Sequence, residues 1–262
     1  GSCTMTEELF VKDVMSRPVT IAKAAVITEA LDKMLNEGID PLIVLNNNSV
    51  VGTVSRWSVA EKLGTKRNSS ISPNSIHVAN TVEEDFTTVY PDQDVEILIP
   101  LLQTYKIVVV YDEEHRLIGK VTAEDLLKVY RPNGTLQEVM EEACTIDTEE
   151  RVVHLRRRMI DDKIIRFIVT DQDRVVGIVT ETDVAVAMRN FREVVDDKHQ
   201  EHRIRNLLVK DIMSKPVLSV SVGSTVDQVI NLMVTKKISS VPVIRGETLA
   251  GLVTRDSLIR AL

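Results

Sequence analysis

Apolar residues recur along this chain in two patterns, one with a spacing of three to four residues and one of short continuous runs. The first pattern lies at Ile27, Leu31 and Met34; Val95, Ile99 and Leu102; Val152, Leu155 and Met159; and Val226, Val229 and Met233. Such spacing indicates helices with one buried stripe. The second pattern indicates short strands at Leu42–Leu45, Ile107–Tyr111, Phe167–Thr170 and Val241–Ile244, each followed by a polar turn. The chain is therefore predicted to contain four copies of an α/β unit, ordered strand–helix–strand–strand–helix.

A second, glycine-led strand closes each unit and runs into a helix. The copies begin at Gly52, Gly119, Gly177 and Gly251, which are 67, 58 and 74 residues apart. Each has a serine or threonine at its fourth position. The seventh position is Asp125 or Asp183 in the middle two copies, and Ser58 or Ser257 in the outer two. Self-similarity of this kind identifies a repeat protein.

The repeats also share their opening segments. Val11–Thr20 and Val209–Leu218 are close relatives of each other, and the third opening, Leu136–Met140, is looser. The second opening, at Val82–Val89, lacks the methionine. From the opening methionine to the motif glycine there are 37, 37 and 38 residues in repeats one, three and four.

One unit of this kind leaves an apolar face uncovered, so the units are expected to pair. After a lead-in at residues 1–10, repeats one and two predict a first domain at 11–133, and repeats three and four a second at 134–262. Lys66–Asn80 is rich in Ser and Asn and predicts a loop. Met188–Asn206 is charged, lacks Gly and Pro, and predicts one extended helix.

Composition narrows the function classes. The chain has 262 residues, of which 44% are hydrophobic and only 3% aromatic, so an aliphatic core is expected. We expect a cytoplasmic protein, because no apolar run reaches membrane-spanning length, no signal peptide is evident, and two cysteines form no disulfide framework. A net charge of −7 argues against general nucleic-acid binding.

The Asp-Val-Met-Ser-x-Pro-Val opening at Asp13–Val19, the Val-Pro-Val-Ile strand at Val241–Ile244 and the Gly-Leu-Val-Thr ending at Gly251–Thr254 resemble CBS (cystathionine-β-synthase) domains. The resemblance covers nearly the whole chain as four CBS motifs, which implies two tandem pairs, or Bateman modules. It implies regulation rather than catalysis, through AMP, ADP, ATP or S-adenosylmethionine bound in clefts between paired repeats. Four repeats without a catalytic domain are similar in layout to the γ subunit of the AMP-activated protein kinase. That layout implies an unidentified regulated partner protein and allows a homodimer.

The resemblance also implies which residues hold such a ligand. A ribose diol needs a carboxylate acceptor, for which Asp183 and Asp125 stand in place. The opening strand of the paired repeat supplies the adenine slot. The implied ligand-binding residues are Asp183, Thr180, Val217, Leu218, Ser219, Lys236 and Lys237 in the second module, and Asp125, Thr122, Val19, Thr20 and Ile21 in the first.

Phosphate binding requires cations or helix N-terminal amides, and the two modules differ in cations. Lys163 and Arg166 in repeat three accompany Lys236 and Lys237, whereas the corresponding loop of repeat one is acidic and that of repeat two keeps only Lys106. The sequence therefore favours the second module and the Asp183 cleft. Arg56 and Arg255 directly follow the motif hydroxyl and are further candidates for phosphate contact.

Other hypotheses stay open. Asp125 and Asp183 fit a simpler role as helix caps, and the chain fits a structural assembly module with empty clefts. A nucleic-acid or metal-binding regulator is a third hypothesis, although His199 and His202 suit a solvated helix face better than a metal site. The run Arg156–Arg158 predicts a surface face, and Cys144 predicts a core position. The sequence contains no Ser-His-Asp order, Walker loop or metalloprotease motif.

Overall fold

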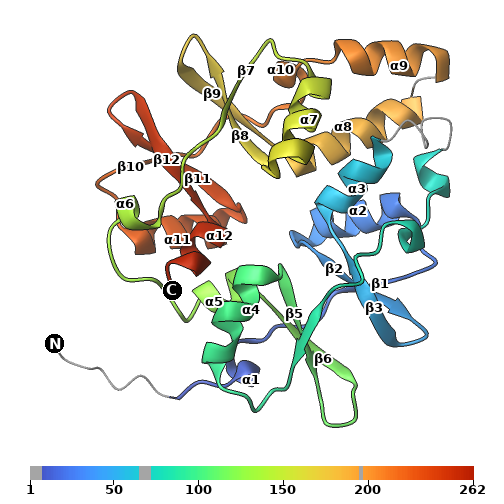
Figure 1. Cartoon of the computed structure of the whole chain (residues 1–262), viewed down its shortest axis with the longest axis vertical. Helices are drawn as coiled ribbons and strands as arrows, with labels where there is room; N and C mark the ends of the chain where they lie inside the picture. Colours follow the sequence, from blue (N-terminus) through green and yellow to red (C-terminus); the bar gives the residue numbers. More distant parts are fainter. Residues whose placement is uncertain (1–7, 65–71, 195–196) are drawn as a thin grey trace.

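The computed structural model describes residues 8–64, 72–194 and 197–262, and each repeat forms a small three-stranded sheet (Figure 1). In every sheet the first strand runs parallel to the second, which is antiparallel to the third. A helix connects the two parallel strands, as such a crossover requires. The predicted α/β class is confirmed.

The elements repeat in the same order along the chain. Repeat one contains α1 (Val11–Val14), β1 (Thr20–Ala22), α2 (Ile27–Glu37), β2 (Leu42–Asn46), β3 (Ser49–Val54) and α3 (Arg56–Leu63). Repeat two contains β4 (Thr87–Val89), η4 (Val95–Ile97), α4 (Leu98–Thr104), β5 (Ile107–Tyr111), β6 (Leu117–Thr122) and α5 (Ala123–Leu127). Repeat three contains α6 (Leu136–Val139), β7 (Thr145–Asp147), α7 (Val152–Asp162), β8 (Arg166–Asp171), β9 (Arg174–Thr180), α8 (Glu181–Val194) and α9 (Asp197–Asn206). Repeat four contains α10 (Val209–Ile212), β10 (Val220–Ser221), α11 (Val226–Lys236), β11 (Ser240–Arg245), β12 (Thr248–Thr254) and α12 (Arg255–Arg260).

The helical stripes predicted from the sequence face the core. All of their members are buried except Ile99, which is half-buried against the core. No helix among the described residues is both long enough and apolar enough to cross a membrane.

Paired repeats exchange their opening segments. The chain at Ser16 bonds to Lys120 of repeat two, and the chain at Glu83 bonds back to Thr53 of repeat one. The second pair does the same through two backbone bridges, Glu141 to Leu252 and Ser214 to Ile178. Each motif strand is therefore covered by the opening of its partner repeat.

The motif glycine makes this exchange possible. A methyl group added at Gly119 would lie 2.7 Å from Sδ of Met15, and one added at Gly177 would lie 2.7 Å from Sδ of Met213. Met140 lies over Gly251 in the same way. Gly52 of repeat one faces the opening of repeat two, which lacks methionine, and Val82 lies over it instead. The methionine and glycine that recur at constant spacing in the sequence thus contact the partner repeat, not their own.

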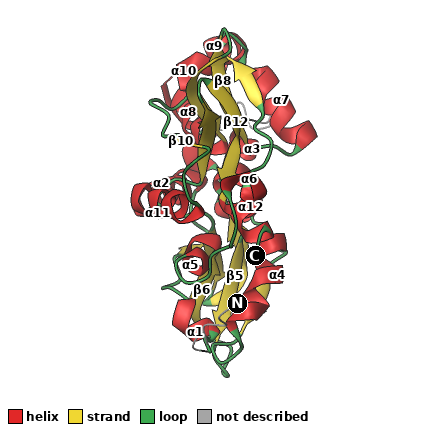
Figure 2. Ribbon diagram, turned by 90° about the vertical axis from the view of Figure 1, so that its left-hand side faces the viewer, coloured by secondary structure: helices red, strands yellow, loops and turns green. Residues whose placement is uncertain are grey.

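Two hydrophobic cores join the modules within one chain. One core combines repeats one and three, where α3 packs against α8. The other combines repeats two and four, where α12 packs against α4 and α5. Viewed along its shortest axis the chain is broad, and the perpendicular view is much narrower, so the four repeats form a flat assembly (Figures 1 and 2).

Both predicted insertions differ from their predictions. The predicted single helix over Met188–Asn206 is wrong, because α8 ends at Val194 and the separate helix α9 packs beside α7. This arrangement brings Ile204 and Leu207 against the core, which a straight continuation would leave in solvent. Part of the predicted loop Lys66–Asn80 lies outside the described residues. The remainder buries Ile76 and Val78 and bonds to the start of α2.

Two smaller predictions also need correction. Cys144 is half-buried, one residue before β7, and packs against the edge of the core, not within its fully buried set. The Arg156–Arg158 run is not simply a surface face. Arg156 donates to the carbonyl oxygen of Gly64 at 3.0 Å, and the guanidinium of Arg158 lies 4.6 Å from the ring centre of Phe167. Arg156 therefore joins α7 of one module to the end of α3 of the other.

The exchange predicts a clear cost for enlarging a motif glycine. In Gly251→Ala, the new methyl group would lie 2.8 Å from Sδ of Met140 and 2.9 Å from the carbonyl oxygen of Glu141. We expect the free energy of unfolding to fall by about 1–3 kcal/mol, the usual cost of overpacking. Chemical denaturation measures it. The control is Gly223→Ala, whose added methyl would have no neighbour closer than 3.9 Å. Equal stability of the two variants would contradict the role given to the glycine.

Candidate functional site

All four repeats contribute to a pocket at the centre of the assembly. This central pocket has a volume of about 120 Å³. Its charged lining residues are Asp40, Arg56, Lys106, Arg166, Glu181, Lys237, Arg255 and Asp256. The hydroxyl residues Thr122 and Thr180, which end two motif strands, line it as well. Five basic against three acidic side chains make the central pocket suited to an anion.

The arginines of the central pocket are held by the fold. Arg56 donates from Nη2 to the carbonyl oxygens of Met34 and Ile39, at 2.9 and 3.2 Å, while its Nε is buried without a hydrogen-bond partner in the described part of the chain. Burial lowers the pKa of Arg255, the nearby Glu124 opposes that shift, and the neighbouring Arg166 and Arg56 reinforce it. The positive charges are thus gathered closely enough to repel one another.

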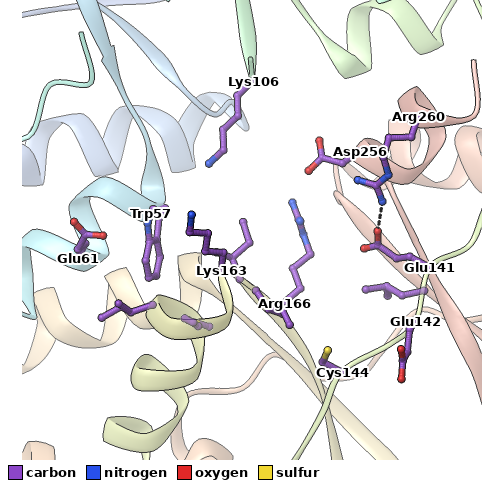
Figure 3. A pocket seen from close by; sticks show the side chains of 15 residues that line it. Trp57, Glu61, Lys106, Glu141, Glu142, Cys144, Lys163, Arg166, Asp256 and Arg260 are labelled. Atoms are coloured by element: carbon purple, nitrogen blue, oxygen red, sulfur yellow. Dashed lines mark hydrogen bonds and ion pairs between the residues drawn. The ribbon is translucent and has the colours of Figure 1, made fainter. Parts of the chain in front are cut away.

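A larger cavity of about 810 Å³ adjoins the central pocket, with Lys106, Arg166 and Asp256 lining both. We call it the inter-module cavity, because Trp57, Glu61 and Lys106 come from the first module and the other lining residues from the second. Figure 3 shows Lys106, Lys163 and Arg166 directed into the same space. Its volume lies within the usual range for small-molecule sites.

The inter-module cavity has apolar and acidic walls in addition to its cations. Trp57, Ile160 and Ile164 provide apolar surface, and Cys144 lies at its edge. Glu61, Glu142 and Asp256 provide carboxylates, whereas Glu141 is paired with Arg260 (Figure 3). A ligand with an apolar ring, hydroxyl groups and a negative end would find all three kinds of contact.

Two of the cavity's neighbouring lysines hold an unusual backbone conformation. Lys163 and Lys237 end α7 and α11 with φ of 56° and 54°, where α2 ends with Gly38 at 64°. Residues with a Cβ rarely adopt this left-handed region, and glycine is the usual choice at such helix ends. Lys163 faces the inter-module cavity, and Lys237 faces the central pocket. Backbone strain of this kind points to a role for the side chain.

Asp183 closes the N-terminal turn of α8 and also contacts the opening of repeat four. Its Oδ2 accepts from the backbone N–H of Thr180 at 2.9 Å, and its Oδ1 accepts from the Ser214 hydroxyl at 2.7 Å. Burial raises the pKa of Asp183, and these hydrogen bonds oppose the shift. Helix capping and a contact with the partner repeat therefore coexist at this carboxylate.

Asp125 is held more tightly by the first module itself. Its Oδ2 accepts from the backbone N–H of Thr122 at 2.9 Å and from Nζ of Lys120 at 3.0 Å. Both side chains of this ion pair are largely buried. The adjacent cavity, lined by Val19, Lys120 and Thr122, measures only about 20 Å³. Lys120 thus forms an ion pair with Asp125, the carboxylate that the resemblance assigned to ribose binding.

The serine copies cap their helices in the same manner. Ser58 bonds with Ser55, and Ser257 with Thr254, in reciprocal capping boxes. The cavity beside Ser55 measures about 450 Å³ and is lined by Glu83, Glu84 and Asp85, which disfavour phosphate. By contrast, the repeat of Ser257 also provides Asp256 to the inter-module cavity.

The other sequence-predicted residues fall in several places. Val217 and Ser219 line an open recess of about 1280 Å³ on the outer side of the second module, and Asp183 is not among its lining residues. Leu218 is 42% exposed, and Lys236 is exposed. In the first module, Ile21 is a core residue and Thr20 accepts a hydrogen bond from Lys33. Of the implied ligand-binding residues, the structure therefore gathers Thr122, Thr180 and Lys237 around the central pocket. The further phosphate candidates Arg56 and Arg255 line it too.

Some residues of the site were missed from the sequence. Lys120 lies two positions before Thr122, so strand alternation already placed the two side chains on one face. Trp57 lines the inter-module cavity, which forms only when the first module meets the second. No sequence signal for that meeting was available.

The Lys120–Asp125 pair predicts a test by a double-mutant cycle. Lys120→Met leaves Asp125 as a buried carboxylate without its cation, so we expect stability to fall by about 3–5 kcal/mol. Adding Asp125→Asn removes the unpaired charge and restores a large part of the loss. Chemical denaturation at neutral pH measures all variants. Removing the exposed Lys210–Glu149 pair is the control, with a far smaller effect expected. A double variant no more stable than Lys120→Met would refute the pairing.

Comparison with known proteins agrees with this architecture. The family model described as the CBS domain matches residues 11–65, 78–132, 136–190 and 209–262. The matches leave only short connecting segments between them.

Two archaeal proteins illustrate the similarity. Protein MJ1225 of Methanocaldococcus jannaschii is 24% identical over 92% of this chain and 94% of its own length. Its crystal structure, described as that of a candidate archaeal homologue of γ-AMPK, superposes with a TM-score of 0.79 at 22% identity. The superposition covers 96% of this chain and 99% of that one. An uncharacterised conserved protein of Pyrococcus horikoshii superposes with a TM-score of 0.61 at 23% identity, covering 96% and 99%. The chain belongs to the CBS-domain family, with four CBS domains in one polypeptide.

Proposed function

We propose that this chain is a regulatory module that binds an adenosine nucleotide, AMP, ADP or ATP, and signals to a partner protein. The observation that carries the proposal is the convergence of Lys106, Lys163 and Arg166 in the inter-module cavity (Figure 3). CBS-domain pairs are typically regulatory ligand-binding modules, and the MJ1225 comparison adds a relative described as similar to γ-AMPK.

The contacts available in the cavity match the parts of a nucleotide. Trp57 and Ile164 offer apolar surface to an adenine ring, and Glu142 or Asp256 offers a carboxylate to the ribose hydroxyls. Phosphates would lie at Lys163 and Arg166, next to the central pocket. Because these are cations, they favour a phosphorylated ligand over S-adenosylmethionine, which carries positive charge.

This proposal differs in place from the sequence-based one. The sequence favoured the Asp183 cleft, and that cleft stays a prediction. Cations and space together favour the neighbouring cavity, whose motif carries Ser257 in place of aspartate. A carboxylate one residue earlier, at Asp256, is available there instead.

Signalling follows from where the cavity lies. Trp57 and Lys106 belong to the first module, while Lys163 and Arg166 belong to the second, so a bound nucleotide would contact both. A ligand shifts a conformational equilibrium only through its differential affinity for the two states. A nucleotide bridging the modules favours their closed arrangement, and a partner protein that recognises this arrangement reads the signal.

Lys163→Gly separates binding from folding. Glycine relieves the left-handed backbone at φ 56°, so we expect stability to rise by about 1 kcal/mol. Loss of the ammonium group removes a charge-assisted phosphate contact, so we expect AMP and ATP affinity to fall about tenfold to a hundredfold. Isothermal titration calorimetry measures affinity and thermal unfolding measures stability.

The control is Gln172→Gly, which relieves a φ of 48° in the β8–β9 turn away from the cavity and leaves affinity unchanged. Asp183→Ala tests the neighbouring cleft in parallel. If Asp183→Ala loses nucleotide binding and Lys163→Gly does not, the nucleotide binds in the Asp183 cleft. If no adenosine compound stabilises the wild-type chain, the result supports a structural module instead. If the chain retains DNA in a salt-sensitive manner, the result supports a nucleic-acid regulator.

A further inference from the structure

Glu181 is a buried acid in the wall of the central pocket. It is the first residue of α8, directly after Thr180, and only 5% of its surface is exposed. Its Oε2 is fully buried and has no hydrogen-bond partner in the described part of the chain. None of the ion pairs within 4 Å among the described residues includes it. A buried carboxyl group in this state is costly unless something supplies the missing contact.

Charged groups reach the central pocket from every element around Glu181. They are Asp40 before β2, Arg56 on α3, Lys106 before β5, Arg166 on β8, Lys237 after α11, and Arg255 and Asp256 on α12. Burial is the main cause that raises the pKa of Glu181 and Asp40 adds to it, while Arg166 and Lys106 oppose it. The neutral form of Glu181 is therefore more accessible than that of a solvent-exposed glutamate, despite the surrounding cations.

The two forms of Glu181 act oppositely on an anion. A neutral carboxylic acid has an O–H group that donates a hydrogen bond, whereas an ionised carboxylate only accepts and repels negative charge. The pocket volume of about 120 Å³ is suited to a small tetrahedral oxyanion. Arginine and lysine side chains recognise such groups well.

We propose that the central pocket is a proton-coupled oxyanion site, which takes a sulfate- or phosphate-class anion together with one proton on Glu181. The proton comes from solvent and stays on the carboxyl group, whose O–H then donates to an anion oxygen. Where the anion is the terminal phosphate of a nucleotide, this inference rests on the proposed function. A free inorganic anion tests the site without that assumption.

The sign of the pH dependence follows from linkage. Bound anion favours the protonated form, so the pKa of Glu181 rises further on binding. Affinity is full below the pKa of the free site and falls by up to about tenfold per pH unit above it. Sulfate is the probe, because phosphate itself titrates near neutral pH.

The experiment measures sulfate affinity by isothermal titration calorimetry from about pH 5 to about pH 9 at constant ionic strength. Repeating it in buffers of different ionisation enthalpy gives the proton uptake. For the wild-type chain we expect affinity to decrease with pH and up to one proton to be taken up per sulfate. Glu181→Gln retains a donor of the same shape, so we expect it to bind sulfate with no pH dependence.

Glu113→Gln is the matched control, because Glu113 is exposed in the turn between β5 and β6 and lines neither the inter-module cavity nor the central pocket, and we expect it to keep the wild-type pH profile. Sulfate binding without proton uptake, an unchanged profile in Glu181→Gln, or no sulfate binding would each overturn the inference. AMP titrated in the same series separates the two proposals. AMP binding without proton-coupled sulfate binding leaves the proposed function standing alone, whereas proton-coupled sulfate binding without AMP binding leaves only the oxyanion site.

Discussion

The contact between an opening segment and the motif glycine of the partner repeat is the interaction on which the rest of this structure depends. Met15 packs on Gly119, and Met213 packs on Gly177. Each contact holds the opening of one repeat against the motif strand of the other repeat in the pair. A side chain at the glycine would push the opening away, and with it the backbone bridges beside it. Because the exchange is reciprocal, neither repeat of a pair completes its sheet environment alone. The pair is therefore the structural unit, and clefts form where its two members meet.

The two modules share this frame but use it differently. In the first module, Lys120 binds Asp125 and leaves little space beside it, so that cleft is closed by the chain's own cation. In the second, the position of Lys120 is taken by Ile178, and the hydrogen bonds to Asp183 from the described residues come from hydroxyl and backbone groups. The cavity at which Lys106, Lys163 and Arg166 converge lies where the second module faces the first. Charge is thus concentrated at the junction of the modules, where a ligand has the greatest influence on their arrangement.

The helices and strands of the four repeats were largely predictable from the sequence, because they depend on local patterns of apolar and polar residues. Helical stripes such as Leu155 and Met159 were found because spacing fixes which face is buried, and strands such as Ile107–Tyr111 because apolar runs end in polar turns. The division between α8 and α9 was not foreseen, since it depends on a surface that Leu207 meets only in the folded chain. The inter-module cavity was missed for the same reason. Trp57 and Arg166 lie more than a hundred residues apart, and their modules are brought together by the packing of α3 against α8 and of α12 against α4 and α5.

The central claim is that a nucleotide bridges the two modules at the inter-module cavity. A crystal structure of the chain grown with AMP tests it most directly, because it places the ligand without relying on a variant. We expect the adenosine to lie against Trp57, with its phosphate between Lys163 and Arg166 at the entrance to the central pocket. AMP bound at Asp183 with the inter-module cavity free of nucleotide, or no AMP bound anywhere in the chain, would contradict the account.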